Sequence, residues 1–283
     1  MRILYTNFHP GDGGGHTTYI LALARAFASR HEVHVAAPGG SRLLHDAAQV
    51  PGVRVFAQTY PGGLRALAAR RPLADYLRAH AFDLVHVNGS ADHRLVIAAA
   101  RTLPRRPRIV LTKHNSKPMR SLGNWWRARH GTDAVIAVSD HTLHALKASP
   151  YRRCRLAGIR NGIDLDHYAP WPQARAEAAR AQWIGDPAAL VFGSSAGTAD
   201  YKGWIDLVEA IALLPAGLRA RVHVLLAGKP PTARHRARIE ELRLVDQVHF
   251  AGWLRDVRPV IAASDSDSAG RAWGPPRCTP RSR

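Results

Sequence analysis

The chain has 283 residues, of which 46% are hydrophobic and 22% charged, so it is long enough for two domains and too apolar for wholesale disorder. Forty lysines and arginines against 21 acidic residues give a net charge of +19, which indicates an anionic partner. No apolar run is long enough to span a membrane, no signal-peptide core follows Met1, and two cysteines cannot form a disulfide framework, so a cytoplasmic protein is expected.

Short apolar runs alternate with helix-period segments from the first residue onward, which is the pattern of parallel α/β units. The strands predicted for the first half are Arg2 to Thr6, Glu32 to Ala36, Val53 to Ala57, Asp83 to Val87, Arg108 to Thr112 and Asp133 to Val138. These runs lack polar alternation, as expected for strands that are buried on both faces. The stretch around Pro170 and Pro172 indicates a connection between two domains.

A second α/β set follows this connection. Its predicted strands are Leu190 to Gly193, Arg221 to Ala227 and Gln247 to Phe250, and its predicted helices are Tyr201 to Leu214 and Ala233 to Leu242. From Ser264 the sequence is rich in arginine and proline and has no periodicity, so we expect a disordered tail. The predicted domains are therefore 1–166, a partial second domain at 167–263, and the tail at 264–283.

Polar residues follow four of the predicted strands. They are Asn7 and His9, Asn88 and Ser90, His114 and Asn115, and Ser139 and Asp140. Ligands bind beyond the carboxyl ends of the strands in open parallel sheets, so four such ends together favour a ligand crevice. Ser139 and Asp140 precede a predicted helix and are also typical helix caps.

The first of these loops contains Gly13, Gly14 and Gly15 at the start of an amphipathic helix. Glycine lets the main chain approach an anion, and the helix N-terminus supplies unpaired N–H donors, so a phosphate is expected there. The spacing is not GxGxxG and no ribose-binding acid follows the second strand, which disfavours a nicotinamide dehydrogenase. The sequence also lacks the GxxxxGK[ST] motif of P-loop NTPases.

In the second half, Lys202 stands where a strand gives way to a helix. A lysine at a helix start opposes the helix dipole unless an anion lies nearby, so it is either a phosphate ligand or a solvated surface residue. Gly228 and Trp253 follow the next two strands, in turns that could also admit a ligand.

A basic stretch with no acidic residue runs from Arg101 to Thr132 and contains two adjacent tryptophans. One interpretation is the solvated surface of an arginine-rich protein. The other is contact with an anionic membrane face, where tryptophans lie at headgroup level. The residues predicted for this membrane patch are Lys117, Arg120, Trp125, Trp126, Arg127 and Arg129. No nucleic-acid-binding module is recognisable, so no nucleic acid partner is expected.

Eight segments in sequence order resemble the family 4 glycosyltransferases of the GT-B fold. They are GDGGGHTT, DLVHVN, TKHN, DAVIAVSDHT, IRNGIDLDHY, DYKGWIDLVEAIALL, VHVLLAGKPP and VHFAGWLRDV, between Met1 and about Asp265. The resemblance implies two Rossmann-like domains, acceptor-side first and donor-binding second. It further implies a retaining transferase that moves a sugar from a nucleoside diphosphate to a glycan or lipid without a metal or other cofactor.

The same resemblance assigns roles to individual residues. Gly14 and Gly15 are similar to the loop that approaches the donor phosphate and the acceptor, and His114 is similar to the histidine that contacts the reacting sugar. Lys202 resembles the lysine that clamps the donor diphosphate, while Gly228 and Trp253 lie in loops that line the nucleotide pocket. His114 could donate a hydrogen bond to a sugar hydroxyl. The implied setting is lipopolysaccharide or surface polysaccharide synthesis, peripheral to the inner membrane.

Two departures from the family pattern bear on activity. No arginine precedes Lys202 between Phe192 and Tyr201, and the family's paired glutamates, expected soon after Asp265, are absent. We therefore expect a truncated or frameshifted chain with little or no transferase activity. The alternative function is an inactive remnant that binds anionic lipid or phosphate ligands without catalysis.

Two DxD triplets, Asp164 to Asp166 and Asp265 to Asp267, are candidate metal-binding motifs. The first lies in the interdomain connection and the second in the predicted tail, so neither is expected to bind a metal. His34, His86 and His223 are isolated within apolar strands, where a core role is more common than a ligand role.

Overall fold

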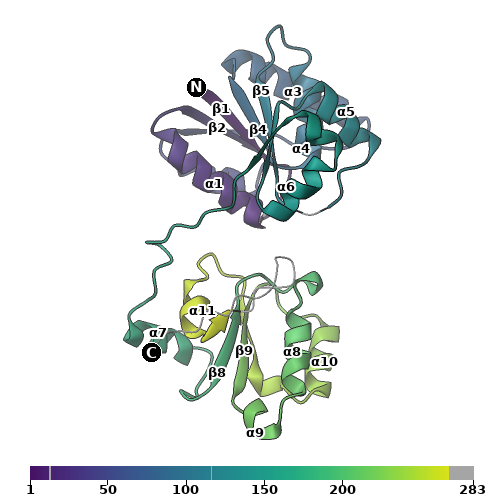
Figure 1. The fold of residues 1–283 in the computed structure, drawn as a ribbon. Coiled ribbons are helices and arrows are strands. Elements are labelled where there is room, and N and C mark those ends of the chain that lie inside the picture. Colours follow the sequence, from purple (N-terminus) through teal and green to yellow (C-terminus); the bar gives the residue numbers. More distant parts are fainter. Residues whose placement is uncertain (13, 116, 268–283) are drawn as a thin grey trace. The chain divides into compact units, whose positions relative to one another are not determined.

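The computed structural model describes residues 1–12, 14–115 and 117–267 and divides the chain into two α/β units (Figure 1). The first unit is Met1–Gly162 and the second begins at Ile163, close to the predicted boundary at residue 166.

The first unit is built on a seven-stranded parallel sheet with the order β3-β2-β1-β4-β5-β6-β7. Its strands are β1 Arg2–Thr6, β2 Glu32–Ala37, β3 Val53–Ala57, β4 Leu84–Val87, β5 Arg108–Lys113, β6 Ala134–Ala137 and β7 Arg155–Gly158. Its helices are α1 Gly14–Ala28, α2 Arg42–Ala48, α3 Arg65–His80, α4 Ser90–Ala100, α5 Leu122–His130 and α6 Asp140–Lys147, followed by a 3-10 turn at Pro150–Arg153. The six strands predicted in this half are confirmed.

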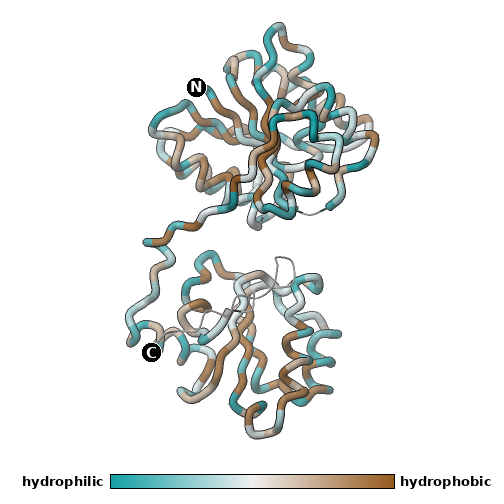
Figure 2. The backbone as a smooth tube through the Cα atoms, in the orientation of Figure 1, coloured by the Kyte–Doolittle hydropathy of each residue, from teal (hydrophilic) through white to brown (hydrophobic). Residues whose placement is uncertain are grey.

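Both faces of this sheet are covered. Successive side chains of a strand point to opposite faces, so Ile3 and Tyr5 join a cluster with α1 and α2, whereas Leu4 joins one with α3 and α4. The inner strands β1, β2 and β4 are accordingly buried along almost their whole length. Figure 2 shows the hydrophobic stretches at the centre of this unit. The carboxyl ends of the parallel strands therefore share one edge of a rigid sheet.

Strand β7 was not predicted. It is a four-residue edge strand that begins with Arg155, and its side chains are half-buried or exposed. An edge strand of this kind has no apolar run to mark it, because only one side of it pairs with the sheet.

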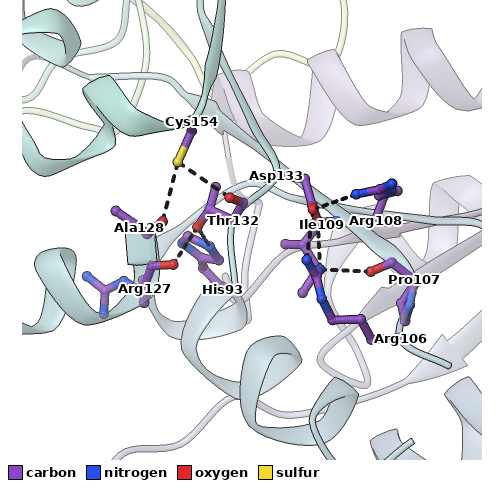
Figure 3. A network of polar contacts seen from close by, with 10 residues as sticks. All are labelled: His93, Arg106, Pro107, Arg108, Ile109, Arg127, Ala128, Thr132, Asp133 and Cys154. Carbon is purple, nitrogen blue, oxygen red and sulfur yellow. Dashed lines mark hydrogen bonds and ion pairs between the residues drawn. The ribbon is translucent and has the colours of Figure 1, made fainter. Parts of the chain in front are cut away.

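A polar network fixes β5 against β6 (Figure 3). The Asp133 carboxylate accepts hydrogen bonds from the Ile109 backbone N–H at 2.8 Å, from Arg106 Nη1 at 2.7 Å and from Arg108 Nη1 at 3.2 Å. Burial opposes ionisation of Asp133, but these bonds hold its pKa below the ordinary value. Two arginines of the basic stretch are thus paired with a carboxylate that lies just beyond it.

The same figure shows how α5 is tied to its surroundings. His93 Nε2 lies 3.0 Å from Thr132 Oγ1, and Thr132 in turn donates to the Arg127 carbonyl at 2.9 Å. The Cys154 thiol donates to the carbonyls of Ala128 and Thr132. The C-terminal end of α5 is therefore anchored to α4 and to the segment that enters β7.

The second unit has a four-stranded parallel sheet with the order β10-β9-β8-β11. Its strands are β8 Leu190–Ser194, β9 Val222–Ala227, β10 Val248–Gly252 and β11 Ser266–Asp267. Its helices are α7 Gln173–Ala181, α8 Trp204–Ala212, α9 Ala216–Arg219, α10 Ala233–Glu241 and α11 Arg258–Ala263, with 3-10 turns at Asp200–Lys202 and Val245–Gln247. The three predicted strands and both predicted helices are confirmed.

The structure differs from the sequence analysis at Ser264, where the disordered tail was expected to start. Ser266 and Asp267 pair with β8, and the Asp265 carboxylate accepts hydrogen bonds from the Val191 N–H at 2.9 Å and from Arg180 at 3.0 Å. The β-sheet pattern therefore continues to Asp267. The rest of the predicted tail, residues 268–283, lies outside the described residues.

Candidate functional site

Three histidines and a tyrosine gather at the carboxyl ends of β1 and β5 and the start of α1. The ring centroids of His16 and His114 are 4.2 Å apart, those of His9 and His16 are 5.0 Å apart, and Tyr19 meets His114 edge-on at 4.8 Å. Tyr19 also lies 3.2 Å from Thr112 Oγ1, one residue before the end of β5. The predicted site residue His114 thus stands in an aromatic cluster with residues of the glycine loop and its helix.

The glycine loop leads directly into this cluster. Gly14 has a φ of +51°, a conformation that favours glycine, and it begins α1. A Cβ atom built on Gly14 or Gly15 would meet no other atom within 4 Å. Packing within the described protein therefore does not require a glycine at 15, and the open space there lets a ligand approach the N–H groups at the start of α1.

The histidines of the cluster are neutral at physiological pH. Burial is the main cause, and together with the neighbouring basic groups it lowers the pKa of His114 to about 3 and that of His16 to about 4. Burial also lowers the pKa of His9. The cluster therefore offers hydrogen-bonding nitrogens rather than positive charge.

The hydrogen bond from His114 to Asn88 changes the role expected for this ring. His114 Nε2 lies 3.0 Å from Asn88 Oδ1, and this amide oxygen accepts a hydrogen bond from the Nε2–H group. In a neutral ring the other nitrogen, Nδ1, is then an acceptor, and no described residue hydrogen-bonds to it. Nδ1 of His114 can therefore accept a hydrogen bond from a ligand hydroxyl, whereas the sequence analysis expected the ring to donate one.

Sequence reasoning missed His16 and Tyr19 of this cluster, and Lys113 beside it. His16 lies inside a helical run, and only its place directly after the glycines could have indicated a role. Lys113 ends β5, and its Nζ donates to Asn115 Oδ1 at 2.5 Å. Burial, and then the charge of Lys117, lower the pKa of Lys113 to about 8, so a partly buried cation stands beside His114 without a carboxylate partner among the described residues.

The second unit brings its predicted residues to the carboxyl ends of β8, β9 and β10. Lys202 ends a 3-10 turn, and Gly203, with a φ of +75°, joins that turn to α8. The Lys202 ammonium lies 5.1 Å from the Tyr201 ring centroid, and no ion pair to it is seen among the described residues. Its charge is therefore available to an anionic ligand.

Backbone contacts connect the neighbouring loops. Gly228 has a φ of +159°, and a Cβ there would come within 2.6 Å of the Thr198 nitrogen, so only glycine fits. The Gly228 N–H donates to the Gly252 carbonyl at 2.8 Å, and Thr198 Oγ1 donates to the Lys229 carbonyl at 2.7 Å. The loops that carry Gly228 and the half-exposed Trp253 are thus held together at one end of the second sheet.

The predicted membrane patch lies on α5 and the segment before it. Trp125 and Trp126 are 47% and 39% exposed, and Leu122, at the start of the helix, is 90% exposed. The guanidinium groups of Arg129 and Arg153 lie 5.8 and 5.7 Å from the Trp125 ring, and that of Arg101 lies 5.5 Å from the Trp126 ring. Arg101 and Arg153 therefore extend the patch beyond the residues predicted from sequence.

The members of the patch are not equivalent. Lys117, Arg120 and Arg129 are exposed, whereas Arg127 is half-buried and donates to Asn124 Oδ1 at 2.6 Å.

No described helix combines the length and the apolar character needed to cross a bilayer.

The candidate metal ligands have other partners. Asp164 Oδ1 accepts from the His167 N–H at 3.0 Å within a turn, and Asp265 pairs with Arg180. Among the described residues, one group of three ligand-type side chains comes close together: Glu32, His34 and His80. Arg2 and Arg54 both pair with Glu32, and this positive charge opposes a bound cation.

His34 and His86 are buried and have the core roles expected for them, whereas His223 is half-buried. His34 is fully buried between Tyr76, whose hydroxyl is 2.6 Å away, and Glu32. His86 lies 2.6 Å from Thr112 Oγ1, and His223 lies 3.0 Å from His249.

Comparison with known proteins gives one matching family model, described as Glycosyltransferase Family 4, over residues 13–167. A curated relative is the GDP-mannose-dependent alpha-(1-6)-phosphatidylinositol monomannoside mannosyltransferase of Mycobacterium tuberculosis. It is 27% identical in an alignment 263 residues long, which covers 88% of this chain and 66% of the relative. The chain thus spans about two thirds of that relative's length.

Solved structures share the fold at lower identity. Anabaena HepE in complex with UDP and glucose superposes with a TM-score of 0.78 and 21% identity, over 94% of this chain and 73% of HepE. WaaG, described as a glycosyltransferase involved in lipopolysaccharide biosynthesis, gives a TM-score of 0.62 and 16% identity, over 94% of this chain and 74% of WaaG.

Proposed function

The chain belongs to glycosyltransferase family 4, and on that premise we propose that it transfers a sugar from a nucleoside diphosphate to a glycan or lipid acceptor with retention of configuration. Its two parallel-sheet units are those of the GT-B fold. The relatives support the donor class, since the mycobacterial enzyme is named for GDP-mannose and HepE was solved with UDP and glucose.

One observation carries the proposal. The open, glycine-lined start of α1 and the neutral ring of His114 meet at one edge of the first sheet, where a phosphate and a sugar hydroxyl can both be bound. A neutral acceptor nitrogen suits a hydroxyl, while the N–H groups of a helix start suit an anion.

The leaving group explains the role proposed for Lys202. When the glycosidic bond breaks, its electron pair stays with the diphosphate, so negative charge on that group grows towards the transition state. A fixed ammonium and oriented amides stabilise this state more than the bound substrate. Lys202, at the start of α8 and without an ion pair among the described residues, is the residue proposed for this task.

We propose that the acceptor is a precursor of lipopolysaccharide or surface polysaccharide, and that the enzyme is peripheral on the cytoplasmic face of the inner membrane. The support is the patch on α5, where two exposed tryptophans stand among arginines. Tryptophan at headgroup level and about 1 kcal/mol per cation near an anionic surface are the expected contributions. Lys117, Arg120 and Arg129 supply exposed charge.

The same patch supports a second candidate function, binding of anionic lipid without catalysis. The two candidates differ in turnover. Purified chain is incubated with UDP- and GDP-sugars, with and without phosphatidylglycerol vesicles, and release of the nucleoside diphosphate is measured. Transferase function predicts release that is slow, because the family's paired glutamates are absent from this sequence. Lys202→Ala should reduce this release further, whereas substitution of the exposed Lys147 should not. Vesicle binding without binding or turnover of any nucleotide-sugar would contradict it and favour the second candidate.

A further inference from the structure

The orientation of the Asn88 side chain is fixed by its contacts. The side chain is buried, and Nδ2 donates to the carbonyl oxygens of Thr6 and His86, at 3.1 and 3.2 Å. A carbonyl oxygen only accepts hydrogen bonds, so the NH₂ group must face these two atoms. Oδ1 is then the atom that faces His114 Nε2, and the histidine must donate.

A buried carboxylate holds this amide in place. Asp92 is fully buried in the first turn of α4, and its Oδ2 accepts from the Asn88 backbone N–H and from Thr6 Oγ1, both at 2.8 Å. Thr6 ends β1, and Asn88 directly follows β4. One oxygen of Asp92 therefore ties the ends of two adjacent strands to the start of a helix.

The surroundings leave this arrangement little freedom. A Cβ on Gly89 would lie 2.9 Å from Asp92 Oδ1 and 2.2 Å from the Phe8 ring, so the backbone between Asn88 and Asp92 is closely packed. The Asn88 amide cannot rotate without losing bonds to Thr6 and His86.

We propose that Asp92 is a positioning residue for His114. Through Thr6 and Asn88 it holds the amide that selects the Nε2–H tautomer of His114, and this leaves Nδ1 as the acceptor for a hydroxyl of the donor sugar. The sugar contact rests on the proposed transferase function, whereas the selection of the tautomer does not.

A merely structural role makes a different prediction. An acidic residue in the first turn of a helix stabilises it through the helix dipole. Asp140 has that position in α6, after β6, but it is exposed and pairs with Arg160. Asp140→Ala is therefore a matched control that removes a first-turn carboxylate of the same unit without touching the bonds to Asn88.

The experiment measures the tautomer of His114 by long-range ¹H–¹⁵N NMR on the full chain labelled at histidine, with His114→Gln to assign its signals. We expect one Nε2–H tautomer in the wild type, in Asp140→Ala and in Asp92→Asn, whose amide oxygen can still accept from Thr6 and Asn88. We expect loss of the single tautomer, seen as averaged Nδ1 and Nε2 shifts, in Asp92→Ala. An unchanged tautomer in folded Asp92→Ala would overturn the proposal.

Asn88→Ala covers the case in which Asp92→Ala does not fold. It removes the oxygen that accepts from His114 Nε2, so the single Nε2–H tautomer should be lost. An unchanged tautomer in folded Asn88→Ala would show that the amide does not select it, and the proposal would fall.

Turnover gives an independent measurement. Asp92→Ala should lower kcat by about tenfold to a hundredfold, as expected for a misplaced contact, with a smaller change in donor KM and with recovery in Asp92→Asn. If the wild type shows no turnover, the transferase function fails while the NMR result still decides the role of Asp92. If the wild type turns over and both Asp92 variants match it, the positioning role fails alone.

Discussion

The ring of His16, from the first turn of α1, lies against the ring of His114, from the end of β5, with their centroids 4.2 Å apart. Both rings are neutral because burial lowers their pKa values far below the ordinary one. The two rings therefore form one neutral hydrogen-bonding surface, and the Lys113 ammonium at the end of β5 is the charge beside it.

Replacement of His114 by alanine should lower kcat/KM for the nucleotide-sugar by about tenfold, the effect of one lost neutral hydrogen bond. The exposed His144, on α6, is the control, and its alanine variant should match the wild type. Steady-state kinetics over a range of donor concentrations measure both. Equal loss in the two variants would contradict a contact between His114 and the sugar.

The pH profile of the same reaction tests the charge state of His114. Its pKa of about 3 means that the ring stays neutral above about pH 4. The wild type and His114→Ala should therefore show the same dependence of kcat/KM on pH near pH 6.5. A decline in kcat/KM there in the wild type but not in His114→Ala would show that His114 titrates as an ordinary histidine.

His93 should make the first unit less stable in acid. Burial lowers its pKa from 6.5 to about 3, so the unfolded chain binds a proton that the folded chain does not. Stability is thus fully present above pH 6.5 and is lost as pH falls towards 3. The free energy of unfolding should fall about 1.4 kcal/mol per pH unit more steeply in the wild type than in His93→Gln between about pH 6 and pH 4. Urea unfolding at several pH values measures it, and equal slopes would contradict the prediction.

Gly89→Ala should destabilise the first unit by about 1 to 3 kcal/mol, because its Cβ would overlap the Phe8 ring in a packed region. Gly123, in α5, is the matched control. A Cβ there makes ordinary contacts, with Arg127 Nη1 at 3.5 Å and Ser121 Oγ at 3.9 Å, and alanine favours a helix, so Gly123→Ala should be neutral or stabilising by up to about 1 kcal/mol. Thermal unfolding compares the two, and a smaller loss for Gly89→Ala than for Gly123→Ala would be inconsistent with the packing described.

Binding to phosphatidylglycerol vesicles should depend on the patch on α5. Arg129→Glu should weaken it by about fivefold or more, since each cation contributes about 1 kcal/mol. Trp125→Ala should weaken it too, whereas Trp171→Ala, which removes a tryptophan stacked on Arg175 outside the patch, should not. Vesicle co-sedimentation at two salt concentrations measures the effect. Equal binding by all variants would exclude this surface.

Periodicity was sufficient to predict the strands that carry an apolar run, including the edge strands β3 and β10. The predicted ends of β1 and β3 match the structure, because apolar runs such as Ile3 to Tyr5 stop where the chain leaves the sheet. The other two edge strands, β7 and β11, were missed, since Arg155–Gly158 and Ser266–Asp267 are short and have no apolar run. The pairing of such short strands depends on tertiary contacts that local sequence does not encode.

The candidate site could be predicted in outline only. Strand-end position was enough to select His114 and Asn88, but the direction of their hydrogen bond depends on carbonyls from two other positions in the sheet. Asp92 looks in the sequence like an ordinary first-turn acid, and its burial depends on Thr6, 86 residues away along the chain. Arg106 was counted in the basic stretch, although it forms an ion pair with Asp133, which directly precedes the neighbouring strand β6.

Cys154 offers a way to time the opening of the first unit. Its thiol donates to two carbonyls at the end of α5, and burial raises its pKa to about 11, so the thiolate is scarce while the unit stays folded. Alkylating reagents react with thiolates, so in a Cys278→Ser background modification of this one side chain should await separation of α5 from the β7 entrance. The rate at which Cys154 is alkylated therefore reports how often α5 separates from the β7 entrance.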